Sequence, residues 1–129
     1  MKYDKYMDKE CIPVCDALNG LPGVETTCSC CGHCREPYRI WFNSVNAYSL
    51  AIIARVFDRR YSGTNVGYRV CMLAKDVERF PQYIYMIESI EPYLSQEDME
   101  EDIKNIVDNF TYWQQPEFNS YFRKGGKDD

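Results

Sequence analysis

Residues 19–43 read NGLPGVETTCSCCGHCREPYRIWFN and predict a turn, a strand, a short loop and a second strand. The opening NGLPG is a strong turn signal, because glycine ends helices and proline cannot continue them. Residues 24–31 and 38–43 alternate in the way that strands do, and the segment between them begins at Gly32 and ends at Pro37. Two strands joined by so short a loop predict an antiparallel hairpin.

The alternation also predicts which side chains of the hairpin face the core. In the first strand the more apolar set, which should meet the helix layer, is Val24, Thr26, Cys28 and Cys30. The opposite set is Glu25, Thr27, Ser29 and Cys31. In the second strand Ile40 and Phe42 should point inward, which leaves Arg39 and Trp41 on the face of the polar first-strand residues.

Helices are expected on both sides of this hairpin. Residues 10–18 predict a helix with Pro13 in its first turn, and its apolar face is Cys11, Cys15 and Leu18. A second helix should run from Asn46 to about Arg60, with Ser44 or Asn46 as its cap. Its apolar stripe would be Leu50, Ile53, Ala54 and Phe57.

The second half of the chain predicts two more strands and a third helix. Residues 66–73 and 83–89 read as the strands. Ser95 begins a variant capping box, and the buried face of the helix behind it should be Met99, Ile103, Ile106, Val107 and Phe110. An acidic run suits the positive end of that helix dipole and comprises Glu97, Asp98, Glu100, Glu101 and Asp102.

These elements predict an α+β fold with the order α-β-β-α-β-β-α. The arrangement is a mostly antiparallel four-stranded sheet with helices packed mainly on one face. A chain of 129 residues is long enough to bury a core of its own. We therefore expect a single domain over residues 1–123 and a disordered tail at 124–129.

Composition and charge narrow the classes of function. No apolar run approaches eighteen residues and the charged N-terminus lacks the apolar core of a secretory signal, so the cytoplasm is the predicted location and no membrane contact is expected. The seven cysteines should then be reduced thiols. The net charge of −5 disfavours nucleic-acid binding, but a local basic face keeps it open, formed by Arg35, Arg39, Arg55, Arg59 and Arg60.

Residues 28–34 hold four of the seven cysteines and the only histidine, His33, and these side chains bind soft metals. A structural zinc site uses four such ligands, commonly in two close-spaced pairs. One pair would be Cys11 and Cys15, and the other Cys31 and Cys34, with Cys30 or His33 as alternatives in the second pair. Zinc is the one cofactor that this pattern suggests.

Two other interpretations of the cysteines stay open. Free cysteine is among the most buried residue types, so a set of them would be small core residues, namely Cys11, Cys15, Cys28 and Cys71. Alternatively, Cys31 would be a nucleophile activated by His33, since residues two apart on a strand share a face. A catalytic thiol needs a third, orienting group, and the sequence does not identify one.

A ligand site is also expected where the first strand ends, because backbone amide groups become available there. The predicted site consists of Thr27, Ser29, Cys30, Gly32 and His33, with Arg39 and Trp41 contributing from the second strand. Its ligand would be a small polar molecule, a metal ion or a protein partner.

Two resemblances to known families rest on this same stretch. The chain resembles the wybutosine-synthesis tRNA methyltransferase family, and it matches a signature of that family at Asn19, Thr26, Thr27, Ser29, Cys30 and Gly32. His33 stands in place of the family's usual arginine. The chain also resembles small bacterial and phage-encoded proteins without an established activity, through Leu18, Asn19, Leu21, Pro22, Gly23, Thr26, Ser29, Cys30, Gly32 and His33. The second resemblance implies that Cys30 and His33 matter most.

The sequence thus supports two hypotheses about function. The first is a small cytoplasmic binding domain that uses the site at the strand end. The alternative, implied by the first resemblance, is an enzyme or accessory factor of tRNA modification whose basic face approaches phosphates. Exposed tyrosines and aromatic residues near the C-terminus permit a homodimer without requiring one.

Overall fold

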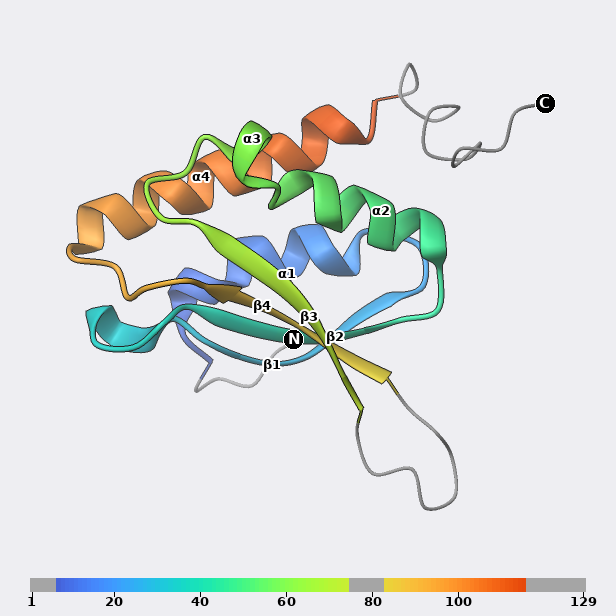
Figure 1. The fold of residues 1–129 in the computed structure, drawn as a ribbon, viewed down its shortest axis with the longest axis horizontal. Helices are drawn as coiled ribbons and strands as arrows, with labels where there is room; N and C mark the ends of the chain where they lie inside the picture. Colours follow the sequence, from blue (N-terminus) through green and yellow to red (C-terminus); the bar gives the residue numbers. More distant parts are fainter. Residues whose placement is uncertain (1–6, 75–82, 116–129) are drawn as a thin grey trace.

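The computed structural model describes residues 7–74 and 83–115 (Figure 1). Their fold is an antiparallel four-stranded sheet with helices packed against one face, which confirms the predicted α+β class and element order. The predicted disordered tail, 124–129, lies outside the described residues. Within those residues, no helix is both long enough and apolar enough to cross a membrane.

The sheet has the strand order β1-β2-β4-β3, and every neighbouring pair is antiparallel. Its strands are β1 (Val24–Cys30), β2 (Arg39–Ser44), β3 (Tyr68–Ala74) and β4 (Tyr83–Ser89). The predicted hairpin is therefore confirmed as β1 and β2. The last strand begins and ends where the sequence predicts it, whereas β3 begins two residues later than expected.

The helices form a layer over one face of this sheet (Figure 1). The α-helices are α1 (Ile12–Asn19), α2 (Ala47–Val56), α3 (Arg59–Ser62) and α4 (Gln96–Trp113). Two short 3-10 helices complete the order, η1 (Lys9–Cys11) before α1 and η2 (Gly32–Cys34) between β1 and β2. No helix in the described part of the chain covers the opposite face of the sheet.

Two of the expected helix starts are confirmed by their caps. The Asn46 side chain accepts a hydrogen bond from the Ser49 amide at 3.0 Å, and the Ser95 hydroxyl accepts one from the Asp98 amide at 3.1 Å. Each side chain satisfies an amide that the first turn of a helix leaves without a partner. Both elements thus begin for the reason that the sequence suggested.

The prediction of one continuous helix over residues 46–60 is wrong. The chain breaks after α2, and Asp58 caps the separate α3 by accepting from the Arg60 amide at 2.8 Å. The apolar stripe is also different, because Ala54 is exposed while Ile52 and Val56 are buried. Aspartate competes with helix continuation because its side chain can bind a backbone amide two residues ahead.

A bulge in β1 overturns the predicted facing of its second half. Thr26 pairs with Phe42 but Cys28 already pairs with Trp41, so Thr27 is an extra residue in the ladder. One extra residue moves every later side chain to the other face. Cys28 is therefore exposed and Cys31 is buried, which reverses the prediction for both. Ser29 faces the helix layer, beside the thiols of Cys11 and Cys15.

The core lies between the sheet and the helices. Its largest fully buried side chains are Tyr38, Tyr93, Phe42, Phe110, Leu18, Ile40, Ile52, Ile53, Ile87, Met99, Ile106 and Val14. Cys11 and Cys15 belong to this core, at 0% and 1% exposure. Their burial supports the interpretation that they are small hydrophobic residues.

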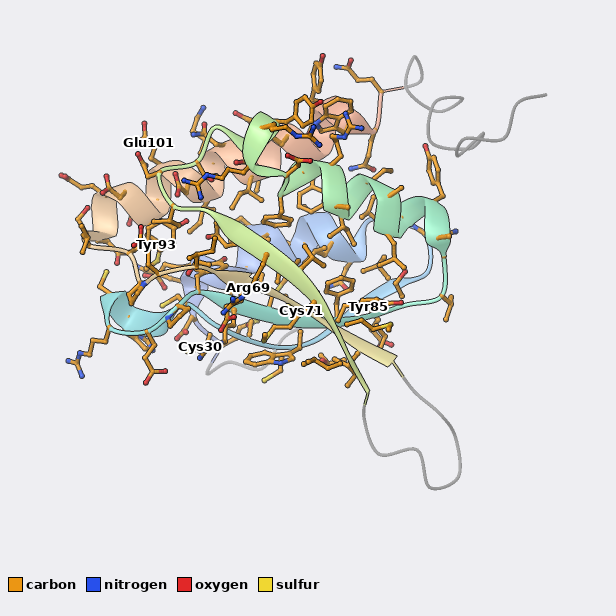
Figure 2. All side chains as sticks on the ribbon, viewed as in Figure 1. Cys30, Arg69, Cys71, Tyr85, Tyr93 and Glu101 are labelled. Atoms are coloured by element: carbon orange, nitrogen blue, oxygen red, sulfur yellow. The ribbon has the colours of Figure 1, made fainter. Side chains whose placement is uncertain are left out.

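A fully buried carboxylate, Asp102, joins α4 to the turn before β3. One of its oxygens accepts from the Asn65 amide at 2.7 Å, and the other accepts from the Val66 amide at 3.2 Å and from the Tyr93 hydroxyl at 2.8 Å. The Tyr93 hydroxyl also meets that of Tyr68 at 2.6 Å. Figure 2 labels Tyr93, which belongs to this network, and Glu101, the residue of α4 that precedes Asp102. The network fixes the packing of α4 on the sheet.

Candidate metal centre

The candidate centre is built on the tight turn that follows β1. Three successive residues there adopt left-handed backbone angles: Gly32 (φ 81°), His33 (φ 52°) and Cys34 (φ 62°). This region is unfavourable for residues other than glycine, and such strain is concentrated at functional sites. A side chain at position 32 would lie 2.8 Å from the Pro37 carbonyl oxygen, so only glycine fits. The turn folds His33 back over Cys31.

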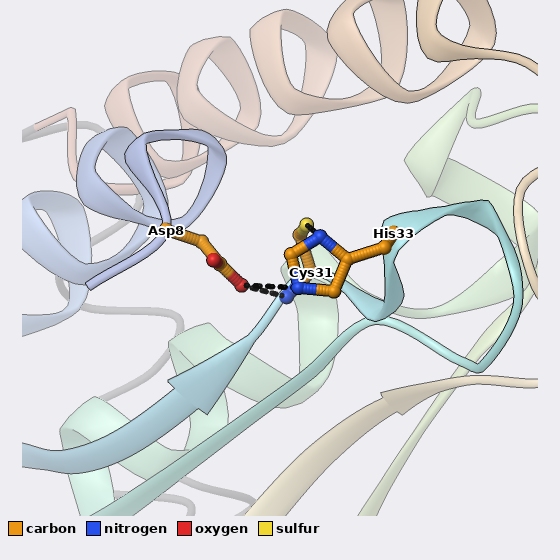
Figure 3. Close-up of side chains that lie close together, drawn as sticks. All are labelled: Asp8, Cys31 and His33. Atoms are coloured by element: carbon orange, nitrogen blue, oxygen red, sulfur yellow. Dashed lines mark hydrogen bonds and ion pairs between the residues drawn. The ribbon is translucent and has the colours of Figure 1, made fainter. Parts of the chain in front are cut away.

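Asp8, Cys31 and His33 come together at this turn (Figure 3). The Cys31 sulfur lies 3.7 Å from Nδ1 of His33, and Nε2 of the same ring lies 3.6 Å from Oδ2 of Asp8. That carboxylate oxygen also accepts a hydrogen bond from the Cys31 amide at 2.9 Å. One thiol, one imidazole and one carboxylate thus place their ligand atoms within 4.8 Å of one another.

The three side chains differ in their access to water. Cys31 is 3% exposed, whereas the His33 side chain is 64% exposed and that of Asp8 is 21% exposed. Burial raises the pKa of the Cys31 thiol to about 11, and the nearby Asp8 charge acts in the same direction. The metal-free thiol is therefore protonated at neutral pH. Solvent therefore reaches the centre through the His33 imidazole.

Only one of the four predicted zinc ligands belongs to this group. Cys31 is a member, while Cys11 and Cys15 lie in the core, and burial raises their pKa values to about 12 and about 11. Cys34 is half-buried and packs against the core. The sequence prediction missed Asp8, because its contact with Cys31 spans 23 residues and depends on how η1 leads into α1.

The predicted ligand site is divided by the same geometry. Thr27, Cys30, Arg39 and Trp41 lie on the uncovered side of the hairpin, where Cys30 pairs with Arg39 and the Thr27 hydroxyl donates to the Trp41 carbonyl at 3.3 Å. The Cys30 sulfur accepts from the Gly32 amide at 3.4 Å, which joins this face to the turn. Ser29 faces the helices instead.

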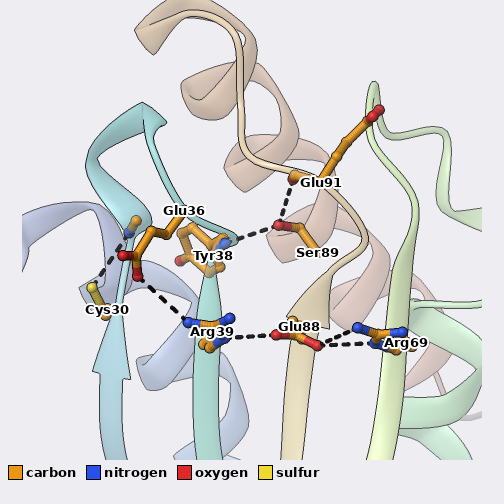
Figure 4. Close-up of polar contacts among 9 residues, drawn as sticks. Cys30, Glu36, Tyr38, Arg39, Arg69, Glu88, Ser89 and Glu91 are labelled. Carbon is orange, nitrogen blue, oxygen red and sulfur yellow. Dashed lines mark hydrogen bonds and ion pairs between the residues drawn. The ribbon is translucent and has the colours of Figure 1, made fainter.

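An ion-pair ladder crosses the uncovered face beside Cys30 (Figure 4). Glu88 of β4 binds Arg39 of β2 at 2.6 Å through one oxygen and Arg69 of β3 at 2.8 Å through the other. The Arg39 hydrogen bond, and then that of Arg69, hold the pKa of this nearly buried carboxyl below its usual range. Arg39 is thus paired within the sheet. Its partner, Glu88, lies 49 residues away in the sequence and was not predicted.

The basic residues of the tRNA hypothesis do not gather on one face. Arg55 lies over the rings of Tyr61 and Trp113, at 4.7 and 4.9 Å from their centroids, on the helix layer. Arg60 lies over the Tyr61 ring at 5.5 Å. Arg39 precedes the core-facing Ile40 in β2, so its side chain lies on the opposite side of the sheet. The fold therefore divides the predicted phosphate-binding face between its two sides.

Comparisons with protein-family models, with curated proteins and with solved structures each find no match to this chain. The two family resemblances therefore stay predictions.

Alkylation of the native, reduced, metal-free protein should separate the cysteines by burial. Cys28 is exposed and should react with iodoacetamide first, whereas Cys11, Cys15 and Cys31 require an opening of the fold and should react at least about 100-fold more slowly. Peptide mass spectrometry over a time course measures each rate. Labelling of Cys31 as fast as that of Cys28 would place its sulfur at the surface and contradict the described centre.

Proposed function

We propose that this chain is a small metal-binding domain that holds a zinc ion through Asp8, Cys31 and His33. The observation that carries the proposal is the convergence of a thiol, an imidazole and a carboxylate within 4.8 Å. These are the three side-chain types that bind zinc in proteins. The proposal keeps the predicted binding domain, the predicted cofactor and Cys31, takes up His33 from the predicted alternatives, adds Asp8, and leaves out Cys11, Cys15 and Cys34.

The distances between the ligand atoms suit zinc. Sulfur at about 2.3 Å and nitrogen at about 2.0 Å from a tetrahedral zinc ion lie roughly 3.6 Å from each other. The Cys31 sulfur and Nδ1 of His33 are 3.7 Å apart, and the Asp8 oxygen is 3.6 Å from Nε2 of the same ring. Small rotations of exposed His33 and of Asp8 would bring one ring nitrogen and both other ligands onto a common ion.

A bound zinc ion would also stabilise the buried thiolate of Cys31. A coordinating thiol is deprotonated by the ion, so the positive charge would offset the burial that disfavours the Cys31 thiolate. Three protein ligands leave the fourth tetrahedral position for water or another exchangeable ligand. Because His33 is largely exposed, that position would be open to solvent.

A cysteine nucleophile is the less favoured use of the same residues. In space, the His33 imidazole lies between the Cys31 thiol and the Asp8 carboxylate. This is the arrangement of a nucleophile, a base and an orienting group. However, the sulfur is 3% exposed, and its pKa is raised to about 11 rather than lowered. A catalytic cysteine requires the opposite on both counts.

Zinc titration of the reduced, metal-free protein tests this proposal. We expect one ion per chain, and substitution with cobalt should give the charge-transfer absorption of a thiolate ligand. His33→Ala removes an exposed imidazole and should weaken binding by more than the roughly 10–100-fold that losing an outer-shell partner costs. Asp8→Asn should weaken it as well, while it keeps an oxygen that can accept from the Cys31 amide.

Cys28→Ser is the matched control, because it removes an exposed thiol of β1 that lies outside the group. It should leave zinc affinity unchanged. Circular dichroism of each variant establishes that the fold persists. Equal zinc binding by the wild type and His33→Ala would overturn the proposed site.

A further inference from the structure

We infer that Cys31 and Cys34 form a redox-active dithiol, and that a low-molecular-weight disulfide converts it to an internal disulfide that dismantles the zinc site. The second half of this inference rests on the proposed function, whereas the first half does not. The oxidant belongs to the chemical class of glutathione disulfide.

The turn brings the two cysteines together. Cys31 caps η2, and Cys34 is its last residue, so the pair stands at the two ends of one tight turn. The first and last residues of such a four-residue turn have Cα atoms less than about 7 Å apart. A disulfide needs about 4.4–6.8 Å between its Cα atoms, and a Cys-x-x-Cys spacing is the usual frame for a redox-active pair.

The neighbouring cysteine does not compete for this partner. Cys30 is the last residue of β1 and pairs with Arg39, whereas Cys31 lies beyond the strand and is buried. The Cys30 sulfur accepts from the Gly32 amide and belongs to the uncovered face of the sheet. Cys34 is half-buried and packs against the core to which Cys31 belongs, so both cysteines of the turn border the same core.

The reaction is a two-step exchange that needs no metal. The half-buried Cys34 is the accessible thiol, and as thiolate it attacks the oxidant, releasing one thiolate and forming a mixed disulfide at Cys34. The Cys31 sulfur then attacks the Cys34 sulfur and expels the second thiolate. The Cys31 proton passes to Nδ1 of His33, 3.7 Å away, and onward to solvent or the leaving group. Two protein thiols and one disulfide become one protein disulfide and two small thiols.

Oxidation would change the metal site directly. A disulfide sulfur carries no thiolate charge, so the proposed zinc site would lose its strongest ligand and keep only Asp8 and His33. Zinc release should therefore follow disulfide formation one to one. The exposed imidazole and half-buried Cys34 make this turn the accessible entry to the site.

Stepwise oxidation of the zinc-loaded protein with glutathione disulfide is the test. We expect intact mass to fall by two hydrogen atoms, peptide mapping to join Cys31 to Cys34, and a chromogenic chelator to detect one zinc ion for each disulfide. Cys34→Ser keeps all three proposed ligands and should retain its zinc under the same oxidant. Cys28→Ser is the control, and it should oxidise and release zinc as the wild type does.

The results separate this inference from the proposed function. A disulfide that joins other cysteines, or zinc loss from Cys34→Ser at the wild-type rate, would overturn the inference while reduced protein still binds zinc. Reduced protein that binds no zinc but forms the Cys31–Cys34 disulfide would contradict the proposed function and support the dithiol. The mapping uses the wild-type chain, so it does not depend on the folding of any variant.

Discussion

Asp102→Ala is expected to lower the free energy of unfolding by about 4 kcal/mol, a large share of the roughly 5–15 kcal/mol that stabilises a domain. The fully buried carboxylate accepts hydrogen bonds from the Asn65 and Val66 amides and from the Tyr93 hydroxyl. Alanine would leave the buried Val66 amide and the neighbouring Asn65 amide without their acceptor, and the Tyr93 hydroxyl with Tyr68 as its remaining partner. A hydrogen bond to a charged group contributes about 1.5–3 kcal/mol, so the loss of these bonds accounts for the expected change. Urea unfolding followed by circular dichroism measures the loss.

Two variants separate the network from the helix that carries it. Glu101→Ala removes the neighbouring carboxylate, which is exposed and accepts a hydrogen bond from the Asn65 side chain, and should change stability by less than about 0.5 kcal/mol. Tyr93→Phe removes one donor from Asp102 and should cost about 1.5 kcal/mol. A loss for Asp102→Ala no larger than that for Glu101→Ala would mean that the carboxylate does not hold α4 in place.

Sequence patterns predicted the elements that depend on local chemistry. Strand alternation and turn residues gave the hairpin of β1 and β2, and the Asn46 and Ser95 side chains cap helices as expected. Each of these signals depends on residues that are close in the sequence, so contacts with distant parts of the chain do not alter it. The fold class follows from the order of such elements.

Features that depend on distant contacts were not predictable in the same way. The acidic run of α4 suggested a solvated helix start, yet Asp102 is buried because Asn65, Val66 and Tyr93 supply donors from other elements. The bulge at Thr27 has no local signature, and together with the turn that begins at Cys31 it exchanges the predicted environments of Cys28 and Cys31. Alternation cannot reveal a residue that the partner strand skips.

The candidate metal centre combines both kinds of information. The cysteine cluster and the single histidine located it at the end of the first strand. Cys31 and His33 do lie close together, but a left-handed turn brings them there and not the shared strand face that was predicted. Asp8 was missed, because no spacing rule connects a residue before the first helix with one after the first strand. The three candidate ligands come from segments 23 residues apart, whereas the sequence favoured pairs of cysteines that are close in the chain.

The metal-free, reduced protein is expected to lose about 4 kcal/mol of stability between pH 8 and pH 10. Cys11 and Cys15 are 0% and 1% exposed, and burial raises their pKa values from 9.0 to about 12 and about 11. Above pH 9 the unfolded chain therefore releases protons that the folded protein retains. Cys31, whose pKa burial also raises to about 11, acts in the same way. Each such thiol removes up to about 1.4 kcal/mol per pH unit above pH 9, and the three together account for the expected loss.

The direction of this effect is fixed by the sign of the pKa shifts. The contribution of these thiols is complete below pH 9, and it is lost as the pH rises toward 11 and 12. Denaturant unfolding at pH 7, 8, 9 and 10 in the presence of a reductant measures it. Cys15→Ala should be less stable at pH 7 but should lose stability only about two thirds as steeply above pH 9, because Cys11 and Cys31 still titrate. Cys28→Ser removes an exposed thiol and should keep the wild-type slope, whereas a wild-type curve that stays flat to pH 10 would show that the helix-facing thiols are accessible to water.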